Sequence, residues 1–351
     1  MMQALQVKRD KEGLAIYIPT NATLPAKVYY GTDSTGKIET DYLEFTGNGW
    51  QEKKDPNSEE RLYFTLQVDL ETFIGAERRL PLNNLYNCRD MGGYLTADGH
   101  LTRWGQVFRS DALHQIDEVG QAYIERMGVK RIIDFRSPEE IAKDPNKQIS
   151  TSETFNFNPH ADVAQQASTQ SVSKKDEDKI AQLEEMVKTE AGRAQLIKNR
   201  NVMVKQMEQL VIGSNAIKAY KHFFKTLLEE EATPMIFHCQ GGKDRTGWAA
   251  ALFLGALGVE KKQIYQDYLL TDKMNAPRNA KRMAIYKKYT ENEDVLAFLA
   301  SLQQTRVDYL DGAYKTVEER YGTMLNYLKE VLEVDVEQLV NLRNKYLYKT
   351  D

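Results

Sequence analysis

The 351-residue chain contains only two cysteines, Cys88 and Cys239. Two cysteines can form at most one bond, which excludes a small secreted scaffold built from disulfides. The five histidines show no spacing typical of metal ligands, and the chain has no His-Glu-x-x-His motif. The sequence therefore predicts that the protein needs neither a metal ion nor any other cofactor.

Neither sign of charge dominates, because 47 basic residues stand against 51 acidic ones without a long block of either. This balance excludes a general affinity for nucleic acid, so any attraction for anions has to be local. No stretch approaches the roughly 18 apolar residues of a membrane helix, and the first ten residues lack the apolar core of a signal peptide. We expect a cytoplasmic protein without a transmembrane segment, or an exported one if a cleaved signal precedes this sequence; the sequence does not indicate an oligomeric state.

Residues 1–78 carry the alternation of apolar and polar residues that is typical of half-buried strands. It is clearest over residues 62–70, and shorter runs at 14–18, 27–30 and 42–45 are separated by turn-forming residues. This pattern predicts a small β-rich N-terminal domain. Because the segment has no cluster of catalytic residue types, we expect it to pack against the rest of the protein.

Residues 79–351 have a different sequence pattern, in which segments typical of strands alternate with segments typical of helices. We expect helices near 117–127 and 138–143 and strands at 130–135, 154–158 and 234–238, with further helices from residue 261 onward. Such alternation predicts an α/β fold, with a mostly parallel sheet flanked by helices.

A long insertion at residues 161–212 interrupts this second domain. It is polar at first, and then carries apolar residues at the spacing of one helix face: Ile180, Leu183, Met186, Val187, Ala191, Ala194 and Ile197. The insertion is either an ordinary amphipathic surface helix or a lid over a functional site.

Residues 238–247 read His-Cys-Gln-Gly-Gly-Lys-Asp-Arg-Thr-Gly, between a short apolar strand pattern and a helix pattern. Glycines let such a loop curl until its amide groups point inward, and the N-terminus of the next helix adds a positive dipole end. The loop therefore predicts a phosphate-binding cradle made of Gln240, Gly241, Gly242, Lys243, Asp244 and Arg245. A Walker nucleotide loop is disfavoured, because Gly-Lys is followed by Asp244 and not by serine or threonine.

Four polar side chains of this motif have a chemical role that suits their type. Cys239 lies where amides and cations favour the thiolate, which is the nucleophilic form. Arg245 offers a planar fork that binds two phosphoryl oxygens at once. We expect the Thr246 hydroxyl to stabilise the sulfur as a leaving group, and His238 to orient the loop from behind.

This motif resembles the signature of the cysteine-dependent protein tyrosine phosphatase superfamily. Three further segments, Asn87–Tyr94, Phe108–Asp111 and Ile133–Ser137, together with the C-terminal helices, are similar to its atypical bacterial branch over residues 80–351. The resemblance implies hydrolysis of phosphate monoesters through a cysteinyl-phosphate, on phosphotyrosine and also phosphoserine or phosphothreonine proteins and inositol phospholipids. It also implies supporting roles near the loop for Asn87, Arg89, Asp90 and Arg136.

The proton donor for the leaving group is the open step, because the chain contains no Trp-Pro-Asp triplet. Asp244 is the first candidate, although an aspartate in a first helical turn can also serve only the helix dipole. Asp134 is the second, either as acid or as support for the loop. Asp90 and Asp111 are weaker candidates.

Two alternatives concern what the site recognises. Lys243 adds a second cation to the cradle, which favours phosphoinositides, unless it is only a solvated lysine on the loop rim. The protein could also be a pseudophosphatase that binds phosphorylated partners without turnover. The presence of Cys239, Arg245 and Thr246 favours an active enzyme.

Overall fold

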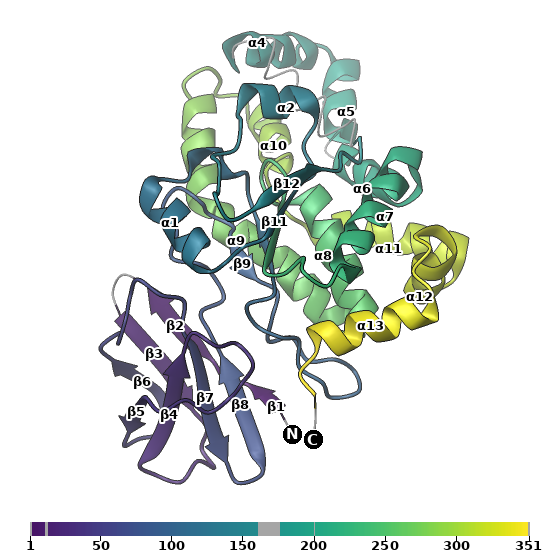
Figure 1. Cartoon of the computed structure of the whole chain (residues 1–351). Coiled ribbons are helices and arrows are strands. Elements are labelled where there is room, and N and C mark those ends of the chain that lie inside the picture. Colours follow the sequence, from purple (N-terminus) through teal and green to yellow (C-terminus); the bar gives the residue numbers. More distant parts are fainter. Residues whose placement is uncertain (1, 11–12, 161–175, 200, 350–351) are drawn as a thin grey trace.

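The computed structural model describes residues 2–10, 13–160, 176–199 and 201–349. Residues up to Gly75 form two sheets that lie apart from the helical body of the protein in Figure 1. One sheet has the order β1-β8-β7-β4-β5, and the other has the order β2-β3-β6. The strands are β1 (Met2–Ala4), β2 (Val7–Asp10), β3 (Gly13–Ile18), β4 (Ala26–Gly31), β5 (Tyr42–Phe45), β6 (Gly49–Lys53), β7 (Tyr63–Val68) and β8 (Glu71–Gly75).

The two N-terminal sheets share one apolar core. Ile16 and Ile18 of β3 point into it from one sheet, and Val28, Phe64 and Leu66 from the other, as the alternating pattern requires. The strands expected in this region are confirmed, and they form a β-sandwich. Its status as a separate domain ending near residue 78 stays a prediction.

The second part is built on a sheet with the order β12-β11-β13-β10-β9. Only the pairing of β9 with β10 is antiparallel. The strands are β9 (Arg89–Asp90), β10 (Val107–Ser110), β11 (Arg131–Asp134), β12 (Glu153–Asn156) and β13 (Met235–His238). The expected α/β fold with a mostly parallel sheet is therefore confirmed.

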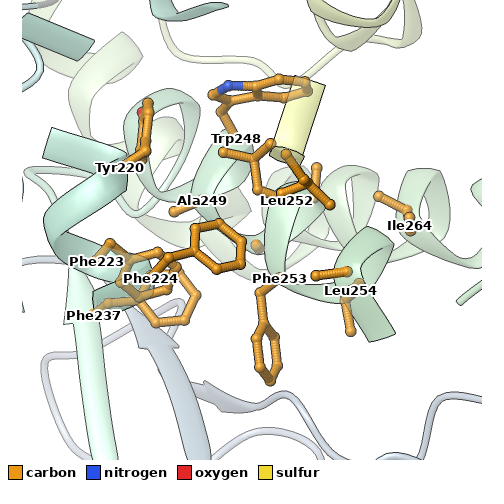
Figure 2. Close-up of a cluster of buried hydrophobic side chains, with 14 of the residues drawn as sticks. Tyr220, Phe223, Phe224, Phe237, Trp248, Ala249, Leu252, Phe253, Leu254 and Ile264 are labelled. Carbon is orange, nitrogen blue, oxygen red and sulfur yellow. The ribbon is translucent and has the colours of Figure 1, made fainter. Parts of the chain in front are cut away.

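Successive residues of the central strands enter two different cores. Phe237 of β13 joins the core under helices α7 (Ser214–Leu228) and α8 (Asp244–Leu257), whereas its neighbour Ile236 joins the core under α1 (Glu118–Arg126). Figure 2 shows the first core, where Phe223, Phe237 and Trp248 gather around the strand and the helices. Because β13 is buried on both faces, the segment that follows it has a rigid base.

Further helices surround this sheet in Figure 1. They are η1 (Leu113–Gln115), α2 (Pro138–Lys143), α4 (Asp176–Val187), α5 (Glu190–Asn199), α6 (Val202–Ile212), α9 (Lys261–Tyr286), α10 (Glu293–Ser301), α11 (Val307–Tyr321), α12 (Met324–Asn326), η2 (Tyr327–Val331) and α13 (Val336–Tyr346). Within the described ranges, no helix is both long and apolar enough to cross a membrane.

The prediction that the insertion has a single apolar helix face is wrong. The helix is broken into α4 and α5, because the Thr189 hydroxyl accepts a hydrogen bond from Gly192 N at 3.0 Å and starts a new helix. The break changes the buried face, so that Leu196 is buried while Ile197 is 47% exposed. The polar first part, residues 161–175, lies outside the described residues.

Candidate active site

The loop Cys239–Lys243 connects the end of β13 to the start of α8, and its carbonyl groups are held from outside. Asn87 Nδ2 donates to Gly242 O at 2.9 Å, and Asn275 Nδ2 donates to Gly241 O at 3.0 Å. Arg109 Nη2 donates to Gly242 O at 2.8 Å, and Ala112 N donates to the carbonyl of Gln240. Every carbonyl from Gln240 to Gly242 is therefore directed away from the loop's centre.

A trans peptide turns its N–H group to the side opposite its carbonyl. The outward carbonyls therefore turn the amides of Gly241, Gly242 and Lys243 toward the inside of the loop. Within the described part of the chain, none of these amides donates to a protein acceptor. The result is a nest of unpaired donors at the N-terminus of α8, which is the arrangement that binds a phosphoryl group.

Gly242 makes the tight loop possible. Its φ is +61°, and a Cβ at this position would lie 2.4 Å from Ser110 O. Any other residue would therefore meet both backbone strain and a collision with a strand. This glycine explains why the cradle can close against β10.

Cys239 lines a cavity of about 660 Å³. Cys239 has a free thiol, and the residue is 3% exposed. Basic side chains outnumber acidic ones in the cavity wall. The basic ones are Lys143, Lys179, Lys243, Arg245, Arg278, Lys281 and Arg282, and the acidic ones are Asp111, Glu140, Asp144 and Asp244.

Arg245 is fixed by a carboxylate that sequence reasoning missed. Its Nη1 and Nη2 atoms donate to Glu140 Oε2 and Oε1 at 2.6 and 2.8 Å. Burial by itself raises the pKa of Glu140, but the hydrogen bonds and charge of Arg245 outweigh it and hold this pKa below its usual value. Glu140 also caps α2 through Ser137, so that helix fixes the guanidinium group of Arg245 in the cavity wall.

Lys243 and Asp244 form a pair in the cavity wall. Lys243 Nζ lies 3.0 Å from Asp244 Oδ2 and donates to Gln304 O at 3.1 Å. In the described residues, Asp244 Oδ1 and Thr246 Oγ1 are buried without a hydrogen-bond partner. Asp244 lines the cavity, so its Oδ1 is available to a bound ligand, whereas Thr246 is fully buried and is not part of the cavity wall. Lys243 is only 8% exposed, so the alternative of a solvated lysine on the loop rim is wrong.

Behind the loop, His238 joins Cys239 to a buried polar network. Its Nδ1 lies 3.2 Å from Cys239 O, and its Nε2 lies 3.0 Å from Asn146 Nδ2. These contacts fit a proton on Nδ1, and burial lowers the pKa of His238 and keeps the ring neutral. Asp134 completes the network, since its Oδ2 accepts from Asn146 Nδ2 at 3.1 Å and from Arg136 Nη2 at 2.8 Å.

This network argues against Asp134 as the proton donor. Burial by itself raises the pKa of Asp134, but the hydrogen bonds and the positive charge of Arg136 outweigh it and keep this pKa below its usual value. Arg136 Nη1 also lies 3.5 Å from Gln240 Oε1. The contacts favour the supporting role for Asp134 and place Arg136 beside the cradle.

A second buried network ties the loop to α9. Arg89 donates to Asp267 Oδ1 at 2.9 Å and to Thr271 Oγ1 at 3.0 Å, and Arg109 contacts the same two residues. Burial by itself raises the pKa of Asp267, but the two guanidinium groups outweigh it and lower the pKa. Arg89 also donates to Asn87, whose amide holds the loop, so both residues occupy supporting positions.

Asp90 does not reach the loop, which corrects its expected supporting role. Its carboxylate accepts from Arg61 Nη2 at 2.8 Å and from the amides of Gly92 and Gly105. Asp90 is on the edge strand, and its bond to Arg61 joins the second part of the protein to the N-terminal sandwich. Asp111 accepts from the amides of Tyr86 and Asn87, which makes it a structural residue as well.

Several residues that position the loop were not expected from the sequence: Arg109, Glu140, Asn146, Asp267, Thr271 and Asn275. Two signals could have found some of them. Ser137 and Glu140 have the spacing of a capping box, and Asp267, Thr271 and Asn275 recur every four residues on one face of α9. No group of three His, Cys, Asp or Glu side chains suited to a metal ion occurs among the described residues.

The sequence was also compared with known proteins. A candidate tyrosine-protein phosphatase of Cupriavidus necator is 28% identical over 284 residues, which cover 80% of this chain and 93% of that protein. The triple specificity protein phosphatase PtpB of Mycobacterium tuberculosis is 27% identical over 266 residues, which cover 73% of this chain and 94% of that protein. The sequence pattern of the tyrosine phosphatase family matches residues 80–348, and this chain therefore belongs to that family.

Proposed function

We propose that this protein hydrolyses phosphate monoesters through a cysteinyl-phosphate formed at Cys239. The Cys239 sulfur attacks phosphorus, the bond to the leaving oxygen breaks, and a carboxylic acid gives that oxygen its proton. Water then attacks the same phosphorus, the sulfur–phosphorus bond breaks, and phosphate leaves. The observation that carries the proposal is the position of Cys239 beneath inward-facing amides and beside the fork of Arg245.

Phosphotyrosine in proteins or peptides is the first substrate class that we propose, and phosphoserine and phosphothreonine follow. Family membership supports a tyrosine phosphatase. The name of the mycobacterial relative states triple specificity for that protein, which supports a wider range here. Release of phosphate from phosphopeptides of each kind tests this range directly.

We also propose inositol phospholipids as substrates, on the basis of Lys243. This ammonium group lies in the cavity wall next to the cradle, and it is bound to Asp244 and not dispersed in solvent. A second phosphate carries more charge than one carboxyl group, so it offers Lys243 a stronger partner than Asp244 does.

We expect Lys243→Ala to lower turnover of soluble inositol phosphates by about tenfold more than turnover of a phosphotyrosine peptide, the effect of one charge-assisted hydrogen bond. Initial rates on both substrates, measured with the same enzyme preparations, give this ratio. Equal losses on both substrates would contradict the proposal, because they would mean that Lys243 shapes the loop and does not select the ligand.

For the proton donor we propose Asp244. Its Oδ1 is buried in the loop without a protein partner in the described residues, whereas both oxygens of Asp134 are occupied by Arg136 and by Asn146. A donor has to lie in the cavity with an oxygen free for the leaving group. Of the two aspartates, only Asp244 lines the cavity.

We expect Asp244→Asn to slow an alkyl phosphate by about 10²-fold or more and an activated aryl phosphate far less, because a good leaving group needs little protonation. The measurement is kcat for a series of phosphates with different leaving groups. Asp134→Asn is the control, and it should lower all members of the series alike. If instead Asp134→Asn shows the dependence on the leaving group, Asp134 is the donor.

A further inference from the structure

Helix α9 presents one continuous polar stripe to the phosphate loop. Asp267, Thr271 and Asn275 lie on this stripe, and each of them is bound to the loop or to an arginine that holds the loop. The spacing of 100° per residue places Arg278 and Arg282 on the same face, one and two turns further along. The buried anchors therefore fix where the next turns of the helix lie.

Along this stripe, Arg278 is the first residue that lines the cavity. It lines the cavity together with Cys239, and a Cβ built on Gly241 would lie 2.7 Å from Arg278 Nη1. The guanidinium group is thus in contact with the rim of the cradle. Within the described ranges, Arg278 has neither an ion pair nor a hydrogen bond.

The cavity has more positive charge than one phosphoryl group requires. Arg245 and the loop amides already serve the scissile phosphoryl, and Lys243 is paired with Asp244. Arg278 and the neighbouring Lys281 and Arg282 are additional. An unpaired, half-buried guanidinium beside a phosphate site is suited to a second anionic group.

We infer that Arg278 is a specificity-determining residue, which binds an acidic side chain next to the phosphotyrosine of a peptide substrate. Apolar surface from Tyr86, Ile285 and Leu302 lines the same cavity, and it suits an aromatic ring and a peptide better than a polyhydroxylated ring. The inference rests on the proposed function, because it concerns what is attached to the group that Cys239 attacks.

The test compares two phosphotyrosine peptides that differ only in their flanking residues, which are aspartate or glutamate in one and alanine in the other. Binding is measured by calorimetry in the Cys239→Ser background, where chemistry is blocked. We expect the acidic peptide to bind about tenfold more tightly, and Arg278→Ala to remove this preference. Arg278→Lys should keep part of it, because a point charge replaces the fork.

Lys273→Ala is the matched control. Lys273 lies on the same helix and is exposed on a face turned away from the stripe, so its removal changes the net charge by the same amount without touching the cavity. The preference for the acidic peptide should remain in this variant. Its loss in both variants would mean that general charge, and not a site at Arg278, causes it.

Two other results would overturn the inference. One is a preference for the acidic peptide that survives Arg278→Ala. The other is weaker binding of a soluble inositol bisphosphate in Arg278→Ala with the peptide preference unchanged, which would assign the site to a second phosphate on an inositol ring. Turnover by the unmodified enzyme is measured separately, so failure of the proposed function is distinguished from failure of this inference.

Discussion

Cys239→Ser is expected to lower turnover of an aryl phosphate by about 10⁴-fold or more and to leave phosphate binding intact. A serine hydroxyl is not ionised at neutral pH, so the nucleophile is lost. The inward amides of the loop and the Arg245–Glu140 pair are unchanged, and these hold the phosphoryl group. Phosphate release and calorimetric binding of phosphate measure the two effects separately.

Cys88→Ser is the matched control for this change. Cys88 belongs to the core on the α1 side of the sheet, whereas Cys239 belongs to the other core. Burial raises the pKa of Cys88 to about 12, so this thiol stays protonated and is not a nucleophile. Turnover should survive in Cys88→Ser. Full activity in Cys239→Ser would contradict the proposed mechanism, and a wild-type protein that binds phosphopeptides without turnover would be a pseudophosphatase.

Arg245→Lys is expected to lower kcat/KM by about 10²- to 10³-fold, the size of effect seen when one transition-state donor is removed. A lysine has the charge but cannot bridge two phosphoryl oxygens, and it cannot keep both bonds to Glu140. Steady-state kinetics on an aryl phosphate measure the loss, and Arg320→Lys on the exposed face of α11 is the control. A kcat/KM within twofold of the wild-type value would show that Arg245 does not contact the transferring group.

The sequence was sufficient for the parts of the site that are contiguous in the chain. Cys239 begins the loop after β13 and Arg245 lies in the first turn of α8, so both residues and their setting can be predicted from one short segment. The α/β fold could be predicted for the same reason, since the strand and helix patterns follow one another along the chain.

The residues that hold the loop could not be predicted in the same way. Glu140 and Asn275 are far from Arg245 and Gly241 in sequence, and only the packing of α2 and α9 brings them together. The motif that contains Asp90 was misleading, because its neighbour Arg89 faces the loop network while Asp90 faces the N-terminal sandwich. Alternate residues of a strand point to opposite sides, and the motif alone does not show which side carries the site.

The break between α4 and α5 was not predicted from the sequence, for a different reason. Apolar residues recur at helical spacing on both sides of Thr189, so periodicity alone predicts one helix. A hydroxyl that caps a new helix changes the direction of the chain without changing that pattern. The proposed role of the insertion as a lid remains a prediction, and Lys179 of α4 already lines the cavity.

The most direct test of the central claim is to trap the phosphorylated enzyme. A labelled aryl phosphate is mixed with excess protein, the reaction is stopped with acid during a single turnover, and the labelled peptide is mapped. The account predicts an acid-quenched protein that carries the label on Cys239, and no label in Cys239→Ser. Label on another side chain, or release of phosphate through a full turnover without any labelled protein, would contradict the account.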